Sequence, residues 1–180
     1  MKVLPADIRE VLIIEPQVFT DARGFFYESF NKKIMEAAGI TANFVQDNHS
    51  RSVRNVLRGL HYQIRQPQGK LVRAIAGEIF DVVVDLRKRS VTFGKWVCVN
   101  LSAENMRMVW IPPGFAHGFL VMSEYAEVLY KTTDYWHPEF ERTIIWNDRH
   151  LAIHWPLHGE PQLSAKDKTG KAFNEAEIFE

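Results

Sequence analysis

The segments RGLHYQ, residues 58–63, and GKLVR, residues 69–73, indicate that the middle of this chain is β-sheet. Their apolar and polar residues alternate with the period of two that is typical of a strand. From Gly59 onward this alternation places His61 on one face and Tyr62 on the other. The glycine leaves the His61 face open for the close approach of a ligand.

The same two segments point to acid–base chemistry. Lys70 opens the second apolar run, and a hairpin is expected to bring its ammonium close to the imidazole of His61. A base beside a cation is the minimum needed to remove a proton from carbon and to stabilise the resulting enolate. An exposed strand that carries ordinary solvated charges is the competing interpretation.

The period of two continues through most of the chain. Strands are expected at residues 11–14, 44–48, 57–64, 71–75, 78–86, 95–101, 106–111, 118–122 and 127–132. One helix is predicted between Asn31, a capping residue, and Gly39, a terminating one. Short, closely spaced strands predict an all-β sandwich or small barrel. The residues that follow lose the alternation and predict an irregular C-terminal extension of loops wrapped over the sheet.

Composition limits the class of protein. With 180 residues, 46% of them hydrophobic, the chain is expected to form one domain over residues 1–180. Lys and Arg together number 22, as do Asp and Glu, so no overall charge favours nucleic acid or an acidic membrane as a partner. We find neither a signal-peptide pattern nor an apolar run of transmembrane length. The single cysteine, Cys98, is expected to be a buried, inert thiol, and the protein is expected to be cytoplasmic.

A second motif argues against metal chemistry. The segment PPGFAH, residues 112–117, has the Pro-x-Gly-x-x-His spacing found in the second motif of cupin barrels. A metal-binding cupin also requires a His-x-His pair in its first motif. Here Gln63 stands two residues after His61, and an amide oxygen is a weak substitute for imidazole at a zinc or iron site. We therefore expect no metal, which leaves acid–base chemistry as the leading option.

A known family carries these motifs and several others in the same order. The blocks are DARG (21–24), FFYE (25–28), QDNHS (46–50), RGLHYQ (58–63), GKLVR (69–73), PPGFAHGF (112–119), YKTTDYW (130–136) and LSAKD (163–167). Over nearly its whole length the chain resembles the dTDP-4-dehydrorhamnose 3,5-epimerases of the dTDP-L-rhamnose pathway. The resemblance implies a cupin-type jelly-roll barrel with one short N-terminal helix, and an isomerase that requires no cofactor.

The resemblance also implies catalytic roles. The substrate would be a dTDP-4-keto-6-deoxy sugar, in which C3 and C5 flank the C4 carbonyl. His61 resembles the base that removes a proton from these carbons, and Asp167 the carboxylate that fixes its tautomer. Tyr130 resembles the acid that reprotonates the opposite face, and Lys70 the cation that stabilises the charge on O4. From its apolar neighbours alone, Tyr130 would instead be a core residue.

Binding residues follow in the same way. His117 resembles a second histidine of the site. Asp81 is expected to be its partner, because this carboxylate lies inside an otherwise apolar strand where an unpaired charge would be costly, and a purely structural pair is the alternative. Because the chain has no glycine-rich phosphate loop, Arg23 and Arg58 are expected to bind the diphosphate through bidentate forks. Other family positions that contact nucleotide or sugar are Glu28, Gln46, Asp47, Asn48, Glu141 and Lys166. Candidates for stacking on the thymine are Phe19, Tyr135 and Trp136, for which ordinary packing is the alternative.

The resemblance further implies a homodimer, in which the strand at residues 11–14 and the block around Arg23 pack against the partner subunit or reach into it. Two other functions stay open. One is a relative that epimerises only C3 in another deoxysugar pathway, and nothing in the sequence separates it from a 3,5-epimerase. The other is a non-catalytic or metal-dependent cupin, and the intact set of catalytic positions argues against it.

Overall fold

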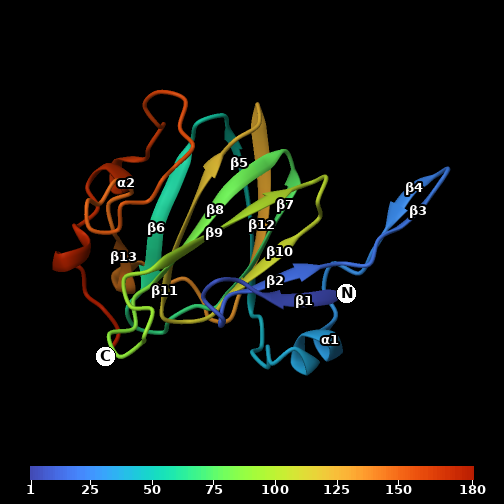
Figure 1. Ribbon diagram of the computed structural model, residues 1–180, viewed down its shortest axis with the longest axis horizontal. Helices are drawn as coiled ribbons and strands as arrows, with labels where there is room; N and C mark the ends of the chain where they lie inside the picture. Colours follow the sequence, from blue (N-terminus) through green and yellow to red (C-terminus); the bar gives the residue numbers. More distant parts are fainter.

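Two antiparallel sheets that face each other form the body of the computed structural model, which describes all 180 residues (Figure 1). The six-stranded sheet has the order β1 (Lys2–Pro5), β2 (Leu12–Glu15), β10 (Met108–Ile111), β7 (Lys70–Ala76), β12 (Tyr125–Thr132) and β5 (Gln46–Val53). The five-stranded sheet has the order β13 (Glu141–Thr143), β6 (Leu57–Gln63), β11 (Phe115–Val121), β8 (Glu78–Asp85) and β9 (Trp96–Ser102). The chain passes back and forth between the two sheets, and the predicted cupin-type jelly roll is confirmed.

The predicted helix is also confirmed, as α1 (Lys32–Ala37). Its N-cap is Asn31, whose side chain accepts a hydrogen bond from the backbone N–H of Ile34, and Gly39 follows it with a φ of +87°. The C-terminal extension contains only short elements: α2 (Ala165–Lys168) and the 3₁₀ turns η1 (Pro138–Phe140) and η2 (Phe173–Glu175). Sequence periodicity missed the strands β1 and β13 and a separate two-stranded hairpin, because a segment of three or four residues is too short to show a period.

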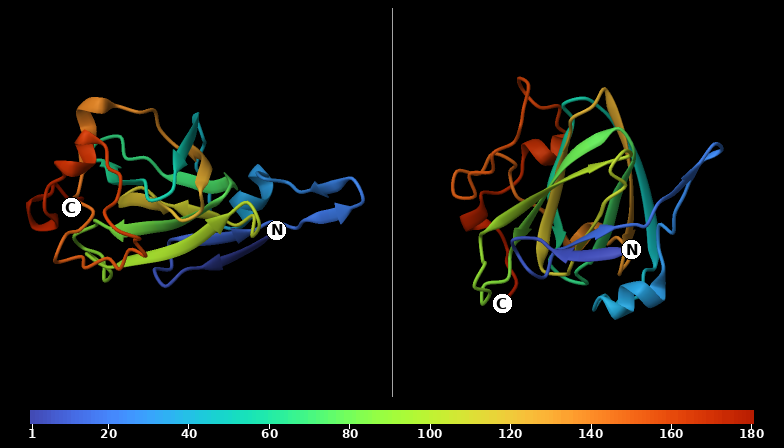
Figure 2. Two further views of the ribbon diagram at one scale, coloured as in Figure 1. Left: turned by 90° about the horizontal axis from the view of Figure 1, so that it is seen from above. Right: turned by 45° about the vertical axis from the view of Figure 1, so that its right-hand side comes forward.

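Inward-facing side chains of both sheets form the main core. Sixteen buried residues pack there, among them Val72, Ile79, Val83 and Val128. The opposite face of the five-stranded sheet is not left to solvent, because the C-terminal extension covers it (Figure 2). The extension thus becomes a third layer, and its residues can reach the strands that it covers.

Cys98 departs from its predicted environment. Strand β9 alternates strictly, so Val97 and Val99 are buried while Cys98 between them is exposed. The apolar run around this cysteine was misleading because a strand at a sheet edge can carry apolar residues on both faces. Partial burial still raises the pKa of the Cys98 thiol.

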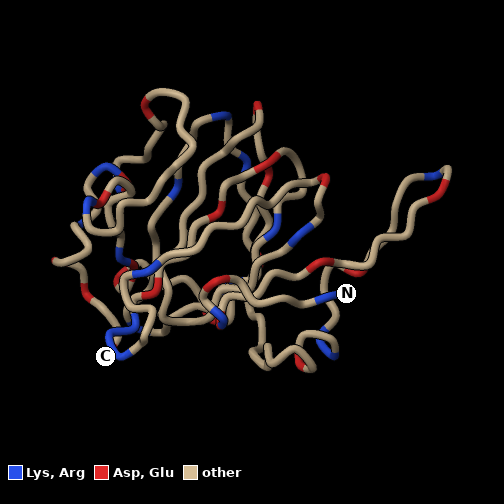
Figure 3. The backbone as a smooth tube through the Cα atoms, in the orientation of Figure 1, with Lys and Arg blue, Asp and Glu red and all other residues tan.

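The hairpin of β3 (Phe19–Asp21) and β4 (Gly24–Phe26) projects away from the body as an arm (Figures 1 and 2). All six residues of its strands are exposed, including the large apolar side chains of Phe19, Phe25 and Phe26. Positive and negative residues are interspersed over the rest of the chain, so no face carries a single sign of charge (Figure 3). No helix is long and apolar enough to cross a membrane.

Strands β6 and β11 approach each other unusually closely at two glycines. A Cβ placed on Gly59 would lie 2.5 Å from the Cα of Gly118 and 2.9 Å from the carbonyl oxygen of His117. Gly59 also has a φ of +128°, which residues with a side chain rarely adopt. The glycine therefore makes room for a neighbouring strand and not, as the sequence suggested, for a ligand.

We predict that Gly59→Ala lowers the free energy of unfolding by about 3 kcal/mol or more, since the cost of the backbone conformation adds to the cost of the steric overlap. Gly159 is a matched control, because it has a φ of +80° but nothing within 4 Å of its Cβ position. Gly159→Ala should cost only about 1–2 kcal/mol. Equal losses for the two variants in urea denaturation would contradict the close-contact explanation.

Candidate active site

The site begins with two histidines on neighbouring strands. His61 on β6 and His117 on β11 are register partners, so their side chains start from adjacent positions on the inner face of the five-stranded sheet. Between this pair and the next, Arg58 with Phe119, strand β6 takes three steps where β11 takes two. This bulge reverses the alternation of β6, and Arg58 consequently lines the same pocket as His61.

Lys70 reaches this pocket from the opposite direction. The sequence predicted a hairpin between its strand and that of His61, but β7 and β6 belong to different sheets. The two side chains instead meet across the barrel interior, where both line the pocket. Proximity was therefore predicted correctly, whereas the hairpin was wrong.

Asp167 is brought to His61 by the C-terminal extension. The Nε2 of His61 lies 2.5 Å from Oδ1 of Asp167, although the two residues are 106 positions apart in the sequence. Ser164 caps α2 by accepting a hydrogen bond from the backbone N–H of Asp167, and its hydroxyl donates to Oδ2 of the same carboxylate at 2.6 Å. Both oxygens of this buried carboxylate are thus fixed.

The ionisation of this pair suits a general base. Burial raises the pKa of Asp167, but hydrogen bonds from His61 and Ser164 outweigh it and hold the pKa below its usual value. Burial lowers the pKa of His61, and it outweighs the hydrogen bond to Asp167 that favours the charged ring. Near neutral pH the carboxylate is ionised and the imidazole is uncharged. Since Asp167 holds the proton on Nε2, the basic lone pair is on Nδ1.

His117 belongs to a second carboxylate–histidine pair. Its Nε2 lies 2.7 Å from Oδ2 of Asp81 on β8, and Asp81 is fully buried. Burial raises the pKa of Asp81, an effect that His117 and Lys70 oppose. Asp81 therefore lies inside the barrel as the sequence suggested, in contact with the histidine expected to be its partner.

Two further proton-transfer groups come from the six-stranded sheet. Tyr130 on β12 packs against the main core and also lines the pocket, so both interpretations of this tyrosine hold in part. Burial raises the pKa of its phenol, which therefore stays protonated at neutral pH. Burial lowers the pKa of Lys70 to about 8, so the ammonium predominates at pH 7.

These groups share a pocket of about 340 Å³. Its wall is formed by Gln46, Asn48, Ser50, Arg58, His61, Lys70, His117, Phe119, Tyr130, Trp136, Glu141 and Lys166. Glu141 and Lys166 form an ion pair of 2.8 Å at the rim. Asp167 lines an adjoining hollow together with Arg58, His61 and Lys166. Of the three aromatic residues considered for the thymine, only Trp136 lines the pocket.

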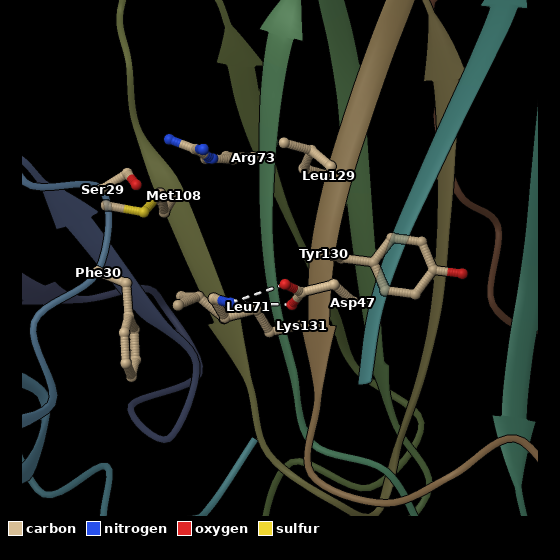
Figure 4. Close-up of a pocket in the computed structure, with 9 residues that line it drawn as sticks. All are labelled: Ser29, Phe30, Asp47, Leu71, Arg73, Met108, Leu129, Tyr130 and Lys131. Atoms are coloured by element: carbon tan, nitrogen blue, oxygen red, sulfur yellow. Dashed lines mark hydrogen bonds and ion pairs between the residues drawn. The ribbon is translucent and has the colours of Figure 1, made fainter. Parts of the chain in front are cut away.

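Three predicted binding residues lie elsewhere in this chain. Asp47 is on the outer face of β5, opposite to Gln46 and Asn48, where it pairs with Lys131 at 2.9 Å. It lines a separate outer pocket of about 220 Å³, and Figure 4 shows the Tyr130 ring pointing away from this side. Arg23 is on the projecting arm, where its nearly fully exposed guanidinium pairs with Asp21. Glu28 accepts a hydrogen bond from Asn31 at the base of the arm.

Gln63, which stands where a metal-binding cupin has its second histidine, has a structural role. The amide oxygen of Gln63 accepts a hydrogen bond from the backbone N–H of His137, and its amide nitrogen donates to the carbonyl oxygens of Gln66 and Tyr135. The side chain is buried and fastens two loops at the pocket mouth. No group of three or more His, Cys, Asp or Glu side chains in the chain is arranged to hold a metal ion.

Sequence reasoning overlooked several residues of the site. Ser50 shares the inner face of β5 with Gln46 and Asn48, so the period of two would have indicated it. Ser164 stands three residues before Asp167, which is the spacing of a helix cap. Ser52 accepts a hydrogen bond of 3.0 Å from Nε of Arg58, and no local sequence pattern indicates this contact.

The chain is similar to known proteins over nearly its whole length. The family model for dTDP-4-dehydrorhamnose 3,5-epimerase matches residues 5–175. A dTDP-4-dehydrorhamnose 3,5-epimerase from Pseudomonas aeruginosa is 63% identical over 99% of both chains. The structure of a 3,5-epimerase from Legionella pneumophila in complex with dTDP-4-keto-L-rhamnose is 56% identical, with a TM-score of 0.96 over 98% of this chain and 94% of the other.

A more distant relative has a narrower activity. The structure of a 3'-monoepimerase from Streptomyces bikiniensis in complex with dTDP-quinovose is 32% identical, with a TM-score of 0.88 over 94% of this chain and 87% of the other. The fold is thus shared by enzymes that invert different numbers of carbons. The family model covers nearly all of this chain, and two relatives that carry its name are 63% and 56% identical to it, whereas the monoepimerase is 32% identical. The chain belongs to the dTDP-4-dehydrorhamnose 3,5-epimerase family of isomerases.

Proposed function

We propose that this protein converts dTDP-4-dehydro-6-deoxy-D-glucose to dTDP-4-dehydro-L-rhamnose, by removal and return of protons at C3 and C5 without a metal or cofactor. The observation that carries the proposal is the His61–Asp167 pair, whose imidazole lines one pocket with Lys70 and Tyr130. A neutral imidazole, a cation and an un-ionised phenol are the base, the enolate-stabilising group and the acid that the reaction requires.

The roles follow from the chemistry of each group. His61 removes the proton next to the C4 ketone through Nδ1, and Asp167 stabilises the imidazolium that forms. Lys70 stabilises the negative charge that develops on O4, and a preorganised donor of this kind contributes about 3 kcal/mol in the transition state. Tyr130 donates a proton to the opposite face of the ring, which inverts the carbon. The same steps serve both carbons, because each flanks the ketone.

We propose that the nucleotide is bound by residues around the pocket mouth and by a partner subunit. Arg58, Lys166 and Trp136 line the mouth, where they can meet the diphosphate and the base. The arm carries Arg23 and Glu28 away from the pocket of their own chain, and its phenylalanines are exposed. A homodimer in which each arm completes the partner's site accounts for both facts. We further propose a cytoplasmic, single-domain enzyme.

An isotope experiment tests the reaction. With the dTDP-4-keto-6-deoxyglucose substrate in deuterated water and excess chelator, the protein should place deuterium at both C3 and C5. His61→Ala should abolish this exchange. Tyr130→Phe should keep exchange, because His61 can return a proton to the face it came from, but should lose inversion as measured with a coupled ketoreductase. Exchange confined to C3 would identify a 3-epimerase, and dependence on a divalent ion would contradict the acid–base mechanism.

The pH dependence of kcat/KM should be bell-shaped. On the acid side activity falls below pH 6.5, because His61 must be uncharged and burial lowers its pKa from that value. On the alkaline side activity falls near pH 8, because Lys70 loses its charge there. Lys70→Arg keeps the charge at all these pH values, so the alkaline limb should move above pH 10, where Tyr130 ionises. A limb that stays near pH 8 in Lys70→Arg would assign it to another group.

Subunit mixing tests the arm. After exchange between Arg23→Ala and His61→Ala proteins, half of the dimers are hybrids with one intact site each, so activity should recover to about a quarter of wild type. The control is a mixture of Arg23→Ala with the Arg23→Ala/His61→Ala double variant, in which no intact site forms beyond the starting level. Absence of recovery despite demonstrated exchange would place Arg23 outside the partner's site.

A further inference from the structure

Asp81 is an inward-facing carboxylate in the middle of β8. Its neighbours at the same face of β8, Ile79 and Val83, belong to the main core between the sheets. Asp81 is fully buried, and only its Oδ2 is bonded, to His117. Its Oδ1 is the single buried side-chain polar atom in the protein without a hydrogen-bond partner. Only one oxygen of the Asp81 carboxylate is needed to orient His117. Burial of the second oxygen without a partner costs free energy, so we expect Asp81 to have another role.

Lys70 is a cation of the pocket that lacks a bonded anion. It extends from β7 into the pocket and makes no direct ion pair, although burial of an ammonium is costly. The charged groups that act on it are Glu141 from β13, Asp81 from β8 and Lys166 from α2. Glu141 has the larger effect of the two anions, but its carboxylate is already paired with Lys166 at 2.8 Å. Asp81 is the anion that still has an unbonded oxygen.

The other titratable groups around Lys70 do not supply a compensating charge. His61 is held neutral by burial, and its own counter-ion is Asp167. The phenol of Tyr130 is un-ionised, and Arg58 adds a further positive charge at the pocket wall. In a medium of low dielectric constant, the negative charge of the Asp81 carboxylate and the positive charge of the Lys70 ammonium stabilise each other.

We propose that Asp81 is a positioning residue that acts through Lys70: its carboxylate is the internal counter-ion that keeps Lys70 in the ammonium form inside the barrel. This inference rests on the proposed function for its purpose, since an uncharged amine would not stabilise the enolate oxygen. Asp81 does not line the pocket that holds His61, Lys70 and Tyr130. Its contact with His117 fixes its position, and its charge acts on the lysine across the barrel.

The charge state of Lys70 can be measured without substrate. Trace acetic anhydride acetylates only uncharged amines, and mass spectrometry of the peptide that contains Lys70 gives the pH at which half of this side chain reacts. In Asp81→Asn, whose amide oxygen can still accept the His117 hydrogen bond, this midpoint should fall by about one pH unit. At pH 7 the initial labelling rate of Lys70 should therefore rise several-fold over wild type.

Asp85→Asn is the matched control. Asp85 is equally buried and lies on the same strand, but it is bonded to Arg87 and Thr92 outside the pocket. The control variant should lower the thermal midpoint of unfolding and leave the Lys70 labelling midpoint unchanged. An unchanged midpoint in folded Asp81→Asn, or equal shifts in both variants, would overturn the proposal.

Infrared spectroscopy and kinetics provide two further measurements. If Asp81→Asn does not fold, infrared spectroscopy of the wild-type protein decides, because Asp81 is the only carboxyl whose pKa is raised. A protonated-carboxyl band at pH 7 would overturn the proposal, and its absence supports it.

In the folded Asp81→Asn variant the alkaline limb of kcat/KM should move to lower pH together with the labelling midpoint of Lys70. If the labelling midpoint moves but no epimerase activity is found in wild type, the counter-ion role stands and the proposed reaction fails.

Discussion

The backbone contact between Gly59 and Gly118 is the constraint on which the site depends. It allows β6 and β11 to approach closely at the point where β6 carries one extra residue. The extra residue changes the face on which the preceding side chain lies, so Arg58 and His61 both line the pocket. Without it the strand would direct one of them away from the barrel interior. A local irregularity in pairing therefore places a phosphate-binding candidate beside the base.

The interior of the barrel is divided into an apolar part and a charged part. Along β7 and β12, inward positions change from Val72 and Val128 to Lys70 and Tyr130 toward one end. The apolar part provides the stability that allows charges to be enclosed at the other end. Burial then acts on two groups in the direction that the reaction requires: it keeps His61 uncharged and Tyr130 protonated. It opposes the charge of Asp167, which hydrogen bonds from His61 and Ser164 restore. Burial also opposes the charge of Lys70.

Local patterns in the sequence predicted local structure well. Asn31 and Gly39 delimited the helix because capping is a property of a few consecutive residues. Alternation correctly predicted that His61 and Tyr62 lie on opposite faces of their strand. The prediction failed where the answer depends on which strands are neighbours. Lys70 follows His61 closely in the sequence but lies in the other sheet, because the connection crosses the barrel and does not form a hairpin. Cys98 was misplaced because an apolar run does not show which of its residues face outward.

The origin of Asp167 has a consequence for how activity arises during synthesis. The strands of both sheets end at residue 143, whereas the carboxylate that fixes the base comes from α2, beyond them in the chain. A nascent or C-terminally cleaved chain that lacks α2 contains every barrel strand and His61, but its imidazole has no fixed tautomer. In such a chain the ring proton can occupy either nitrogen, so the base is no longer confined to Nδ1. The carboxylate that orients the base is thus synthesised after every strand of the barrel.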